Sequence, residues 1–168
     1  MLTRRQFACS LATAGIAATA TPALALWTPD ITLPAAPIPG VNIAPEFYPT
    51  IVEVRRDLAP GSIHVLSNQH FLYFIVRKGV AIRYGVAVGK AELVFRGECV
   101  VGDKVEWPNW KPTPEMIERN PAAYKKYEDG MPGGPKNPLG ARAIYLFQDG
   151  HDTAVRIHGT IDPDSIGH

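Results

Sequence analysis

The sequence predicts a mainly β domain, and three observations support that class. Glycine contributes 15 and proline 16 of the 168 residues, a turn-forming content that is high for a helical bundle. From residue 51 onward, short runs rich in β-branched and aromatic residues alternate with turn residues. Hydrophobic residues make up 46% and charged residues 20%, which supplies a packed core and argues against a disordered chain. We therefore expect one globular domain built from antiparallel hairpins.

The first 25 residues have the pattern of a secretory signal peptide. Two adjacent arginines precede a mildly apolar run over residues 7–20, and Ala23 and Ala25 are small residues at the positions that define a signal peptidase cut. Threonines interrupt the run, so it is too polar for a membrane anchor. Residues 3–7 resemble the twin-arginine export motif, with an ordinary export signal as the alternative. The expected location is the periplasm or cell envelope, with no integral membrane anchor after cleavage.

Residues 26–50 contain six prolines and are expected to form an extended tether. Proline has no amide donor and holds its φ near one value, so such a stretch disfavours regular secondary structure. A run of β-branched residues then begins at Ile51. The folded domain is therefore predicted to span residues 51–168.

Four strand-length runs are expected to open the domain as a meander of hairpins. Turn residues separate the later runs at Ser67-Asn68-Gln69 and at Lys78-Gly79, where positive φ is tolerated. The expected strands are Ile51–Val54, Ser62–Leu66, His70–Arg77 and Val80–Val88.

Helices are expected only in the second half of the domain. Residues 114–119 predict a short helix, because Thr113 is a favourable N-cap, proline stands first and an acidic residue follows. A second short helix is expected over residues 122–127, and another strand over residues 93–102. The segment 131–140 is rich in glycine and proline and is expected to be an ordered loop. The last expected strands are Arg142–Phe147 and Ala154–His158, joined by the polar turn Asp149–Asp152.

Charge and cysteine content exclude several classes of function. The chain has 17 Lys and Arg against 16 Asp and Glu, so it lacks the basic excess of a nucleic-acid binder. Cys9 lies in the predicted signal peptide, which leaves Cys99 as the one thiol after cleavage. An internal disulfide and a CxxC zinc site are therefore not expected, and neither is a cofactor or metal.

His158 is the histidine in the most suggestive setting. It ends a predicted strand and is followed by Gly159-Thr160, where the backbone can turn and leave the imidazole exposed. Histidine titrates near neutrality, so this position suits a general base. From these residues alone, a satisfied core histidine is an equal alternative. His64, His70 and His151 are expected to be surface residues.

Other kinds of site have weaker support in the sequence. A metal site would use histidines and aspartates near the end of the chain, but their spacing matches no zinc pattern. No GxSxG motif is present, and spacing selects no carboxylate pair for glycoside hydrolysis. The residues considered for a metal are His151, His158, His168, Asp162 and Asp164.

Seven segments of the domain carry a family pattern when they are taken in order. They are His70 to Tyr73, Arg83 to Gly89, Trp107 to Trp110, Pro114 to Ile117, Met131 to Gly134, Asn137 to Ala143, and His158 to Thr160. Together they resemble the L,D-transpeptidase (YkuD-type) catalytic domain family, from about residue 61 to residue 168. Several ordered motifs are a more specific signal than one short pattern. An export signal followed by a tether also fits this family.

The resemblance implies a β-sandwich of antiparallel or mixed strands with one or two short helices. It also implies cysteine-dependent acyl transfer on peptidoglycan stem peptides, in which a thiolate forms a thioester that an amine acceptor resolves. His158 matches the catalytic histidine, and Gly159 matches the residue whose carbonyl orients the ring. The implied substrate-binding residues are Met131, Gly133, Gly134, Arg142 and Thr160. The oligomeric state is left open.

The sequence departs from the family pattern at the nucleophile. The family places a Ser-x-Gly-Cys motif further along the chain than the ten residues that follow His158. The chain is therefore expected to be truncated before its nucleophile, with its C-terminal part missing, which leaves the activity of this polypeptide in doubt. Cys99, beside Glu98 in a strand-like run, is not expected to replace it. The alternatives are non-catalytic binding of stem peptides and a structural envelope domain in which Trp107 and Trp110 only pack.

Overall fold

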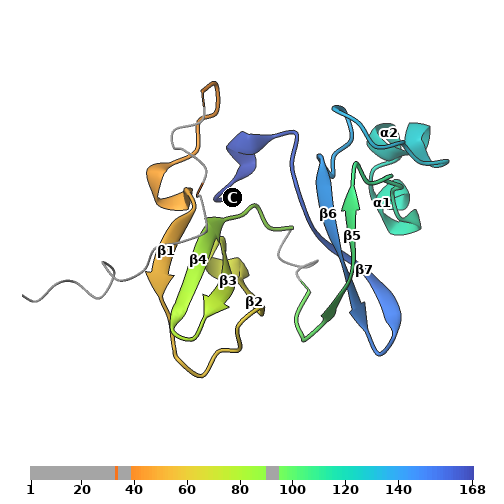
Figure 1. The fold of residues 1–168 in the computed structure, drawn as a ribbon. Coiled ribbons are helices and arrows are strands. Elements are labelled where there is room, and N and C mark those ends of the chain that lie inside the picture. Colours follow the sequence, from red (N-terminus) through yellow and green to blue (C-terminus); the bar gives the residue numbers. More distant parts are fainter. Residues whose placement is uncertain (1–32, 34–38, 90–94) are drawn as a thin grey trace, which may run out of the picture. The chain divides into compact units, whose positions relative to one another are not determined.

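The computed structural model describes residue 33 and residues 39–89 and 95–168. The predicted signal peptide and the first part of the predicted tether lie outside these residues. Within them the strands form two antiparallel sheets and the helices are short, as Figure 1 shows. The predicted mainly β class is therefore confirmed.

The first sheet contains four strands in the order β1-β4-β3-β2. They are β1 (Thr50–Glu53), β2 (Ile63–Leu66), β3 (Phe71–Arg77) and β4 (Val80–Gly85). β3 and β4 form the central hairpin through the predicted turn at Lys78-Gly79, where Gly79 has a φ of +81°. The core of this sheet comes from the same two strands, with Leu72 and Ile75 buried on β3 and Ala81 and Ile82 buried on β4.

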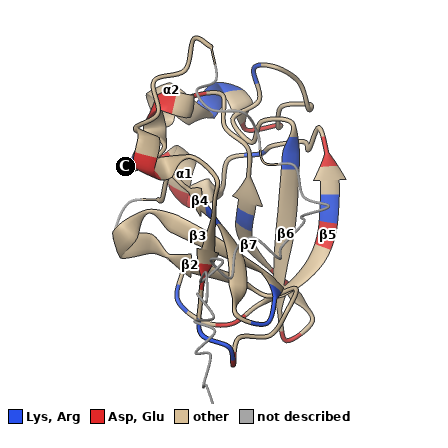
Figure 2. Ribbon diagram, turned by 60° about the vertical axis from the view of Figure 1, so that its left-hand side comes forward, with Lys and Arg blue, Asp and Glu red and all other residues tan. Residues whose placement is uncertain are grey.

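The second sheet contains three strands in the order β5-β6-β7. They are β5 (Val100–Glu106), β6 (Arg142–Gln148) and β7 (His151–His158). β6 and β7 are joined by Asp149 and Gly150, which both have positive φ, at 51° and 78°. Two consecutive positive φ values match the twist of a tight hairpin, which explains the polar turn in the sequence. Figure 2 shows charges of both signs along the edge strand β5, as is typical of a solvated sheet edge.

The strand expected over residues 93–102 lies further along the chain. Residues 95–99 are not in a strand, and β5 begins only after them. Gly97 has a φ of +142°, outside the extended region of L-residues, so regular pairing cannot run through it. β5 is an edge strand that exposes most of its side chains, so polar residues occupy its middle. These polar residues obscure the pattern by which a strand is predicted from the sequence.

The first predicted helix is confirmed together with its cap. α1 (Pro114–Arg119) begins after Thr113, whose Oγ1 accepts a hydrogen bond from the Met116 amide at 3.3 Å. The second is shorter than predicted, because α2 (Pro121–Tyr124) gives way to a 3-10 turn at Lys125–Tyr127. None of the helices in the described part of the chain is long and apolar enough to cross a membrane.

Phe47 anchors the segment before β1 to the first sheet. It ends a 3-10 turn (Pro45–Phe47), and its ring lies against that of Phe71 with the centroids 5.3 Å apart. Gly85 and Gly167 both approach Phe47 so closely that a side chain on either would overlap it. One phenylalanine thus packs between glycines of β4 and of the C-terminal segment.

The folded part of the chain begins before the boundary predicted near Ile51. The Asn42 amide donates a hydrogen bond to Asp164 Oδ1 at 3.1 Å, and β1 opens at Thr50. The proline content of this stretch predicted a free tether. Proline content does not indicate which distant residues a segment contacts, so these contacts could not be predicted from the sequence. The contacts of Phe47 and Asn42 show that residues 42–50 belong to the domain.

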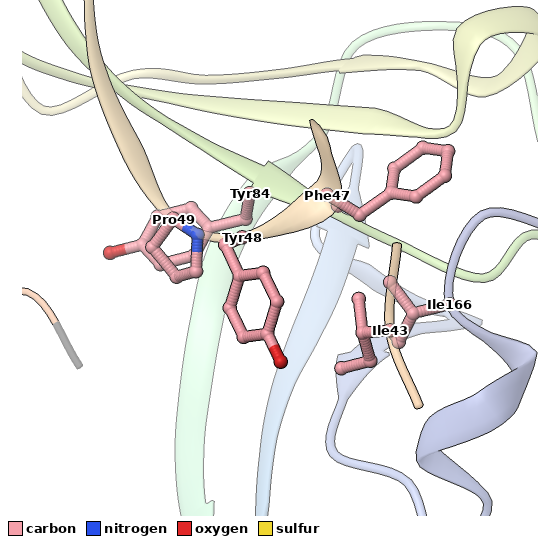
Figure 3. A pocket seen from close by; sticks show the side chains of 7 residues that line it. Ile43, Phe47, Tyr48, Pro49, Tyr84 and Ile166 are labelled. Atoms are coloured by element: carbon pink, nitrogen blue, oxygen red, sulfur yellow. The ribbon is translucent and has the colours of Figure 1, made fainter. Parts of the chain in front are cut away.

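A small apolar pocket of about 180 Å³ lies beside Phe47 (Figure 3). Ile43, from the segment before β1, and Ile166, from the C-terminal segment, lie close together at its edge in the figure. The pocket therefore marks the place where both segments meet the end of β4. Its lining residues are Ile43, Phe47, Tyr48, Pro49, Tyr84, Gly85 and Ile166.

An alanine at Gly85 tests the packing around Phe47. The added Cβ would lie 2.6 Å from the Phe47 carbonyl oxygen, which is backbone and cannot rotate away. We expect Gly85→Ala to lower the free energy of unfolding in urea by about 1–3 kcal/mol. Gly89→Ala is the matched control, because nothing lies within 4 Å of its added Cβ and the change should stay within about 0.5 kcal/mol. Equal unfolding midpoints for the two variants would contradict this packing.

A pH-dependent contribution to stability is expected from an ion pair on β7. The Arg156 guanidinium donates to both carboxylate oxygens of Asp152, at 2.6 and 2.7 Å, and these hydrogen bonds lower the pKa of Asp152. A lowered carboxyl pKa stabilises the fold above the pKa of the unfolded chain, near 4, and this contribution is lost as the pH falls further. The difference in unfolding free energy between the wild type and Asp152→Asn should therefore shrink between neutral pH and about pH 3. A constant difference would show that the ion pair contributes nothing.

Candidate active site

His158 is the last residue of β7, and its ring is held by the next residue. Its Nδ1 lies 2.6 Å from the carbonyl oxygen of Gly159. Because a carbonyl oxygen only accepts, Nδ1 carries the proton in this hydrogen bond. Nε2 of the neutral ring is then left as an acceptor on an exposed side chain. This is the tautomer that a general base needs.

Three strand ends meet at the position of His158. Val105 of β5 pairs with Ala143 of β6, and Ala143 pairs with His158, so the three residues form one row across the sheet. The Gly159 amide donates to the Arg142 carbonyl at 2.9 Å and extends the ladder by one residue. The ring of His158 is therefore presented at the edge of a regular sheet rather than on a free loop.

The loop before β6 comes close to the backbone of Gly159. A Cβ placed on Gly140 would lie 2.9 Å from the Gly159 carbonyl carbon and from the Thr160 nitrogen. Gly140 also has a φ of +66°, so two independent features favour glycine there. The loop and the end of β7 thus form one packed unit, with Gly159 in its middle.

Asn137 organises this loop from the inside. It is 1% exposed, which makes it the buried polar residue of the described chain. Its Nδ2 lies 3.0 Å from the Pro108 carbonyl, 3.1 Å from that of Pro132 and 3.4 Å from that of Met131. Its Oδ1 accepts a hydrogen bond from the Leu139 amide at 3.0 Å. One side chain therefore joins the segment after β5 to two parts of the loop.

Three of the predicted substrate-binding residues lie in this loop. Met131 exchanges backbone hydrogen bonds with Trp110, at 2.7 and 2.9 Å. The Gly133 amide donates to Asn109 Oδ1 at 3.1 Å, and nothing lies within 4 Å of a Cβ placed on Gly134. The backbone of Met131 and Gly133 is therefore fixed, while Gly134 leaves open space beside it.

The other two predicted substrate-binding residues have partners within the protein. The Arg142 guanidinium lies 2.7 Å from Glu106 Oε1, its cross-strand neighbour on β5, and both side chains are exposed. The Thr160 hydroxyl donates to the Asp162 carbonyl at 3.1 Å and accepts from the Asp162 amide at 2.9 Å. A substrate carboxylate would have to compete with Glu106 for Arg142.

The two tryptophans near the loop differ in their surroundings. The ring of Trp110 makes edge-on contacts with Tyr124 and Tyr127, with centroids 6.3 and 5.8 Å apart, and so packs α2 and the turn after it. Trp107 is 46% exposed and has a φ of +49°, which is strained for a bulky residue. Its amide donates to the Ala141 carbonyl at 2.8 Å, which holds this conformation beside the start of β6.

Cys99 lies far from His158. It precedes β5, while His158 shares its row with Val105 near the other end of that strand. At about 3.3 Å per strand residue, the distance along β5 from Cys99 to Val105 is about 20 Å. Hydrogen-bond reach for proton transfer is about 3 Å, so Cys99 cannot give its proton to this imidazole. Among the described residues, no group of three or more His, Cys, Asp or Glu side chains is placed to hold a metal ion.

Sequence reasoning did not single out Asn137 as a residue of the site. It stands in the Asn137–Ala143 motif, but the role of its side chain depends on carbonyls from Pro108, Met131 and Pro132. The one local signal is an asparagine before a proline in a glycine-rich loop, which is typical of a side chain that bonds the backbone two residues on. The Leu139 bond has that form.

Comparisons with known proteins agree with the motifs around this site. The model of the L,D-transpeptidase catalytic domain (YkuD) matches residues 60–168. A protein of Fuscovulum blasticum, named as a candidate L,D-transpeptidase of the ATP synthase subunits region (ORF 5), is 40% identical over 78 residues. That match covers 45% of this chain and 35% of the relative, so it spans about a third of that protein.

A solved structure gives a second, longer likeness. A crystal structure of a Brucella melitensis protein, named as a candidate carnitine operon oxidoreductase (caia), is 50% identical with a TM-score of 0.63. The match covers 72% of this chain and 74% of that one. Since the family model covers well over half of the chain, including His158 and the loop against it, the protein belongs to the L,D-transpeptidase (YkuD) catalytic domain family.

Proposed function

We propose that this domain serves L,D-transpeptidase-type acyl transfer on peptidoglycan stem peptides, with His158 as the general base. The observation that carries the proposal is the 2.6 Å contact between His158 Nδ1 and the Gly159 carbonyl oxygen. It fixes the ring in one orientation and leaves Nε2 available to an incoming proton. Family membership supports the proposed substrate class, and this geometry supports the proposed role of His158.

The chemistry that the site supports proceeds in two steps. His158 Nε2 takes the proton of a thiol, and the thiolate forms a bond to the carbonyl carbon of the third stem residue. The bond to the terminal D-alanine breaks, and its amine leaves with the proton from the imidazolium. An amine acceptor then attacks the thioester, gives its proton to Nε2 and releases the thiolate. Backbone amides beside the thiol would stabilise the oxyanion in both steps.

The wall of the binding site is assigned to the loop that contacts Gly159. Met131 and Gly133 present a backbone that is already fixed by hydrogen bonds, and Gly134 leaves space for an extended peptide. Arg142 and Thr160 flank the end of β7, where a stem peptide would reach His158. A preorganised wall of this kind loses little entropy when a ligand binds.

Stem-peptide binding without turnover is the second candidate function. The observation in its favour is the position of Cys99, which precedes β5 and lies six residues before Val105 in the row of His158. The described residues hold the base and the wall but place no thiol beside them. A binding module would keep the wall formed by the loop and lack the release of D-alanine.

Export to the cell envelope follows from the same proposal, because stem peptides are found there. The twin-arginine pattern of residues 3–7 supports export. An oxidoreductase function, which the name of the Brucella protein suggests for that protein, draws no support from a dinucleotide motif, since no GxGxxG sequence occurs in residues 1–168.

Release of D-alanine separates the two candidate functions. The open reading frame that encodes this chain is expressed to its stop codon, and residues 26–168 are expressed beside it. We expect a protein that has a thiol beside His158 Nε2 to release D-alanine from a tetrapeptide stem, and residues 26–168 to bind the stem without releasing it. Binding without release by both would favour the binding module. If neither protein binds the stem, both candidate functions are wrong.

His158→Gln tests the base directly. We expect the rate of D-alanine release by the full reading frame to fall by about 10²–10⁴-fold, because glutamine cannot accept the thiol proton. Stem-peptide affinity should stay unchanged. His151→Gln is the matched control, since His151 is an exposed histidine at the other end of the same strand. Retained turnover in His158→Gln would exclude the proposed role.

A further inference from the structure

Every polar group of Asn137 is used inside the protein. The side chain donates to the carbonyls around it and accepts from the Leu139 amide. Its backbone amide donates to the Gly134 carbonyl at 2.9 Å, and its backbone carbonyl accepts from the Gly140 amide at 3.0 Å. Replacing a buried amide with this many partners lowers the free energy of unfolding, because each partner would be left without a hydrogen bond.

The chemistry of the site selects asparagine at this position. Nδ2 faces only carbonyl oxygens, and Oδ1 faces only an amide. Aspartate has nearly the same shape but would turn an oxygen toward the carbonyls of Pro108 and Pro132, with a buried charge. Asn137 therefore differs from Asn109, whose Oδ1 accepts from the Gly133 amide on the exposed side of the loop.

The contacts of Asn137 continue to the backbone of Gly159. Leu139 and Gly140, which Asn137 holds through their amides, surround the α-carbon of Gly159. A Cβ placed on Gly159 would lie 3.4 Å from the Leu139 carbonyl oxygen and 3.5 Å from the Gly140 α-carbon. The carbonyl of the same Gly159 accepts from His158 Nδ1. The side-chain amide of Asn137 is thus linked to the His158 imidazole through two sets of contacts. Asn137 contacts Leu139 and Gly140, and these two residues contact Gly159.

We propose that Asn137 is the positioning residue for His158. Its side chain holds the turn from residue 137 to residue 140 against Gly159, and this fixes the carbonyl that selects the Nδ1-protonated tautomer of His158. The catalytic meaning of this inference rests on the proposed function, but the link between the two residues does not. When the hydrogen bonds donated by Asn137 Nδ2 are lost, the Gly159 carbonyl should no longer be held in place. The His158 ring should then exchange between its two tautomers.

The test measures the tautomer of His158 in the intact chain. The ¹⁵N shifts of the imidazole nitrogens are recorded by long-range ¹H–¹⁵N NMR for wild type, Asn137→Asp and Asn109→Asp. His158→Gln identifies the His158 signals. The ring of His64, 2.9 Å from Ser62 Oγ in the other sheet, reports in the same spectra whether the protein remains folded. Sucrose in the buffer favours the folded state of Asn137→Asp, which is expected to be the less stable variant.

We expect widely separated Nδ1 and Nε2 shifts for His158 in wild type and in Asn109→Asp, which keeps its acceptor. In Asn137→Asp the two shifts should converge while the His64 signals stay in place. Wild-type His158 shifts in a folded Asn137→Asp would overturn the inference. If that variant unfolds, Gly140→Ala decides, because the strain at its φ of +66° and the overlap with Gly159 both displace the turn that Asn137 holds. Unchanged His158 shifts in Gly140→Ala would then overturn it.

Turnover separates this inference from the proposed function. In the full reading frame, Asn137→Asp should lower kcat with little change in KM, whereas Asn120→Asp, which keeps the acceptor for the Ala123 amide at the start of α2, should leave both unchanged. If the wild type shows no turnover, the proposed catalysis fails while the NMR result still decides the role of Asn137. Converged shifts with full turnover would show that the positioning is real but that catalysis does not depend on it.

Discussion

The close contact between the backbones of Gly140 and Gly159 is the constraint on which the site depends. Both residues lack a side chain at the point where the loop meets the end of β7, and Gly140 has a φ of +66° that favours glycine. Because Gly159 keeps its amide in the sheet ladder, its carbonyl is free to turn toward His158. The orientation of one imidazole therefore depends on a backbone contact with Gly140, which lies 18 positions before His158 in the chain.

A second set of glycine contacts fixes the chain that follows His158. This segment is anchored at its beginning by Gly140 and at its end by backbone hydrogen bonds between Gly167 and Val86 and between Val88 and His168. Phe47 fills the space that Gly85 and Gly167 leave, so the segment before β1 helps to hold the end of the segment after β7. The proline-rich stretch thus contributes to the domain as well as preceding it.

Local signals in the sequence predicted the elements that local interactions form. The cap at Thr113 and the tight turn around Asp149-Gly150 depend on near neighbours in the chain, and both are present. The register of β5 could not be predicted in this way, because an edge strand exposes its polar residues and has no clear alternation. His158 was singled out because a histidine before a glycine at a strand end is a local pattern, and its role as a base stays a prediction. Asn137 was missed because its partners lie 5 to 29 residues away.

The two candidate functions share one scaffold and differ in a single group. The sheet, the loop and the Gly159 carbonyl determine the tautomer of His158 whether or not a thiol stands beside Nε2. A base that is oriented by the fold itself loses no entropy when substrate arrives, which is how positioning lowers a reaction barrier. A module that only binds stem peptides has no need for such control over one exposed ring. The close hydrogen bond at His158, together with the buried amide that we propose supports it, therefore favours the proposed proton transfer over binding alone.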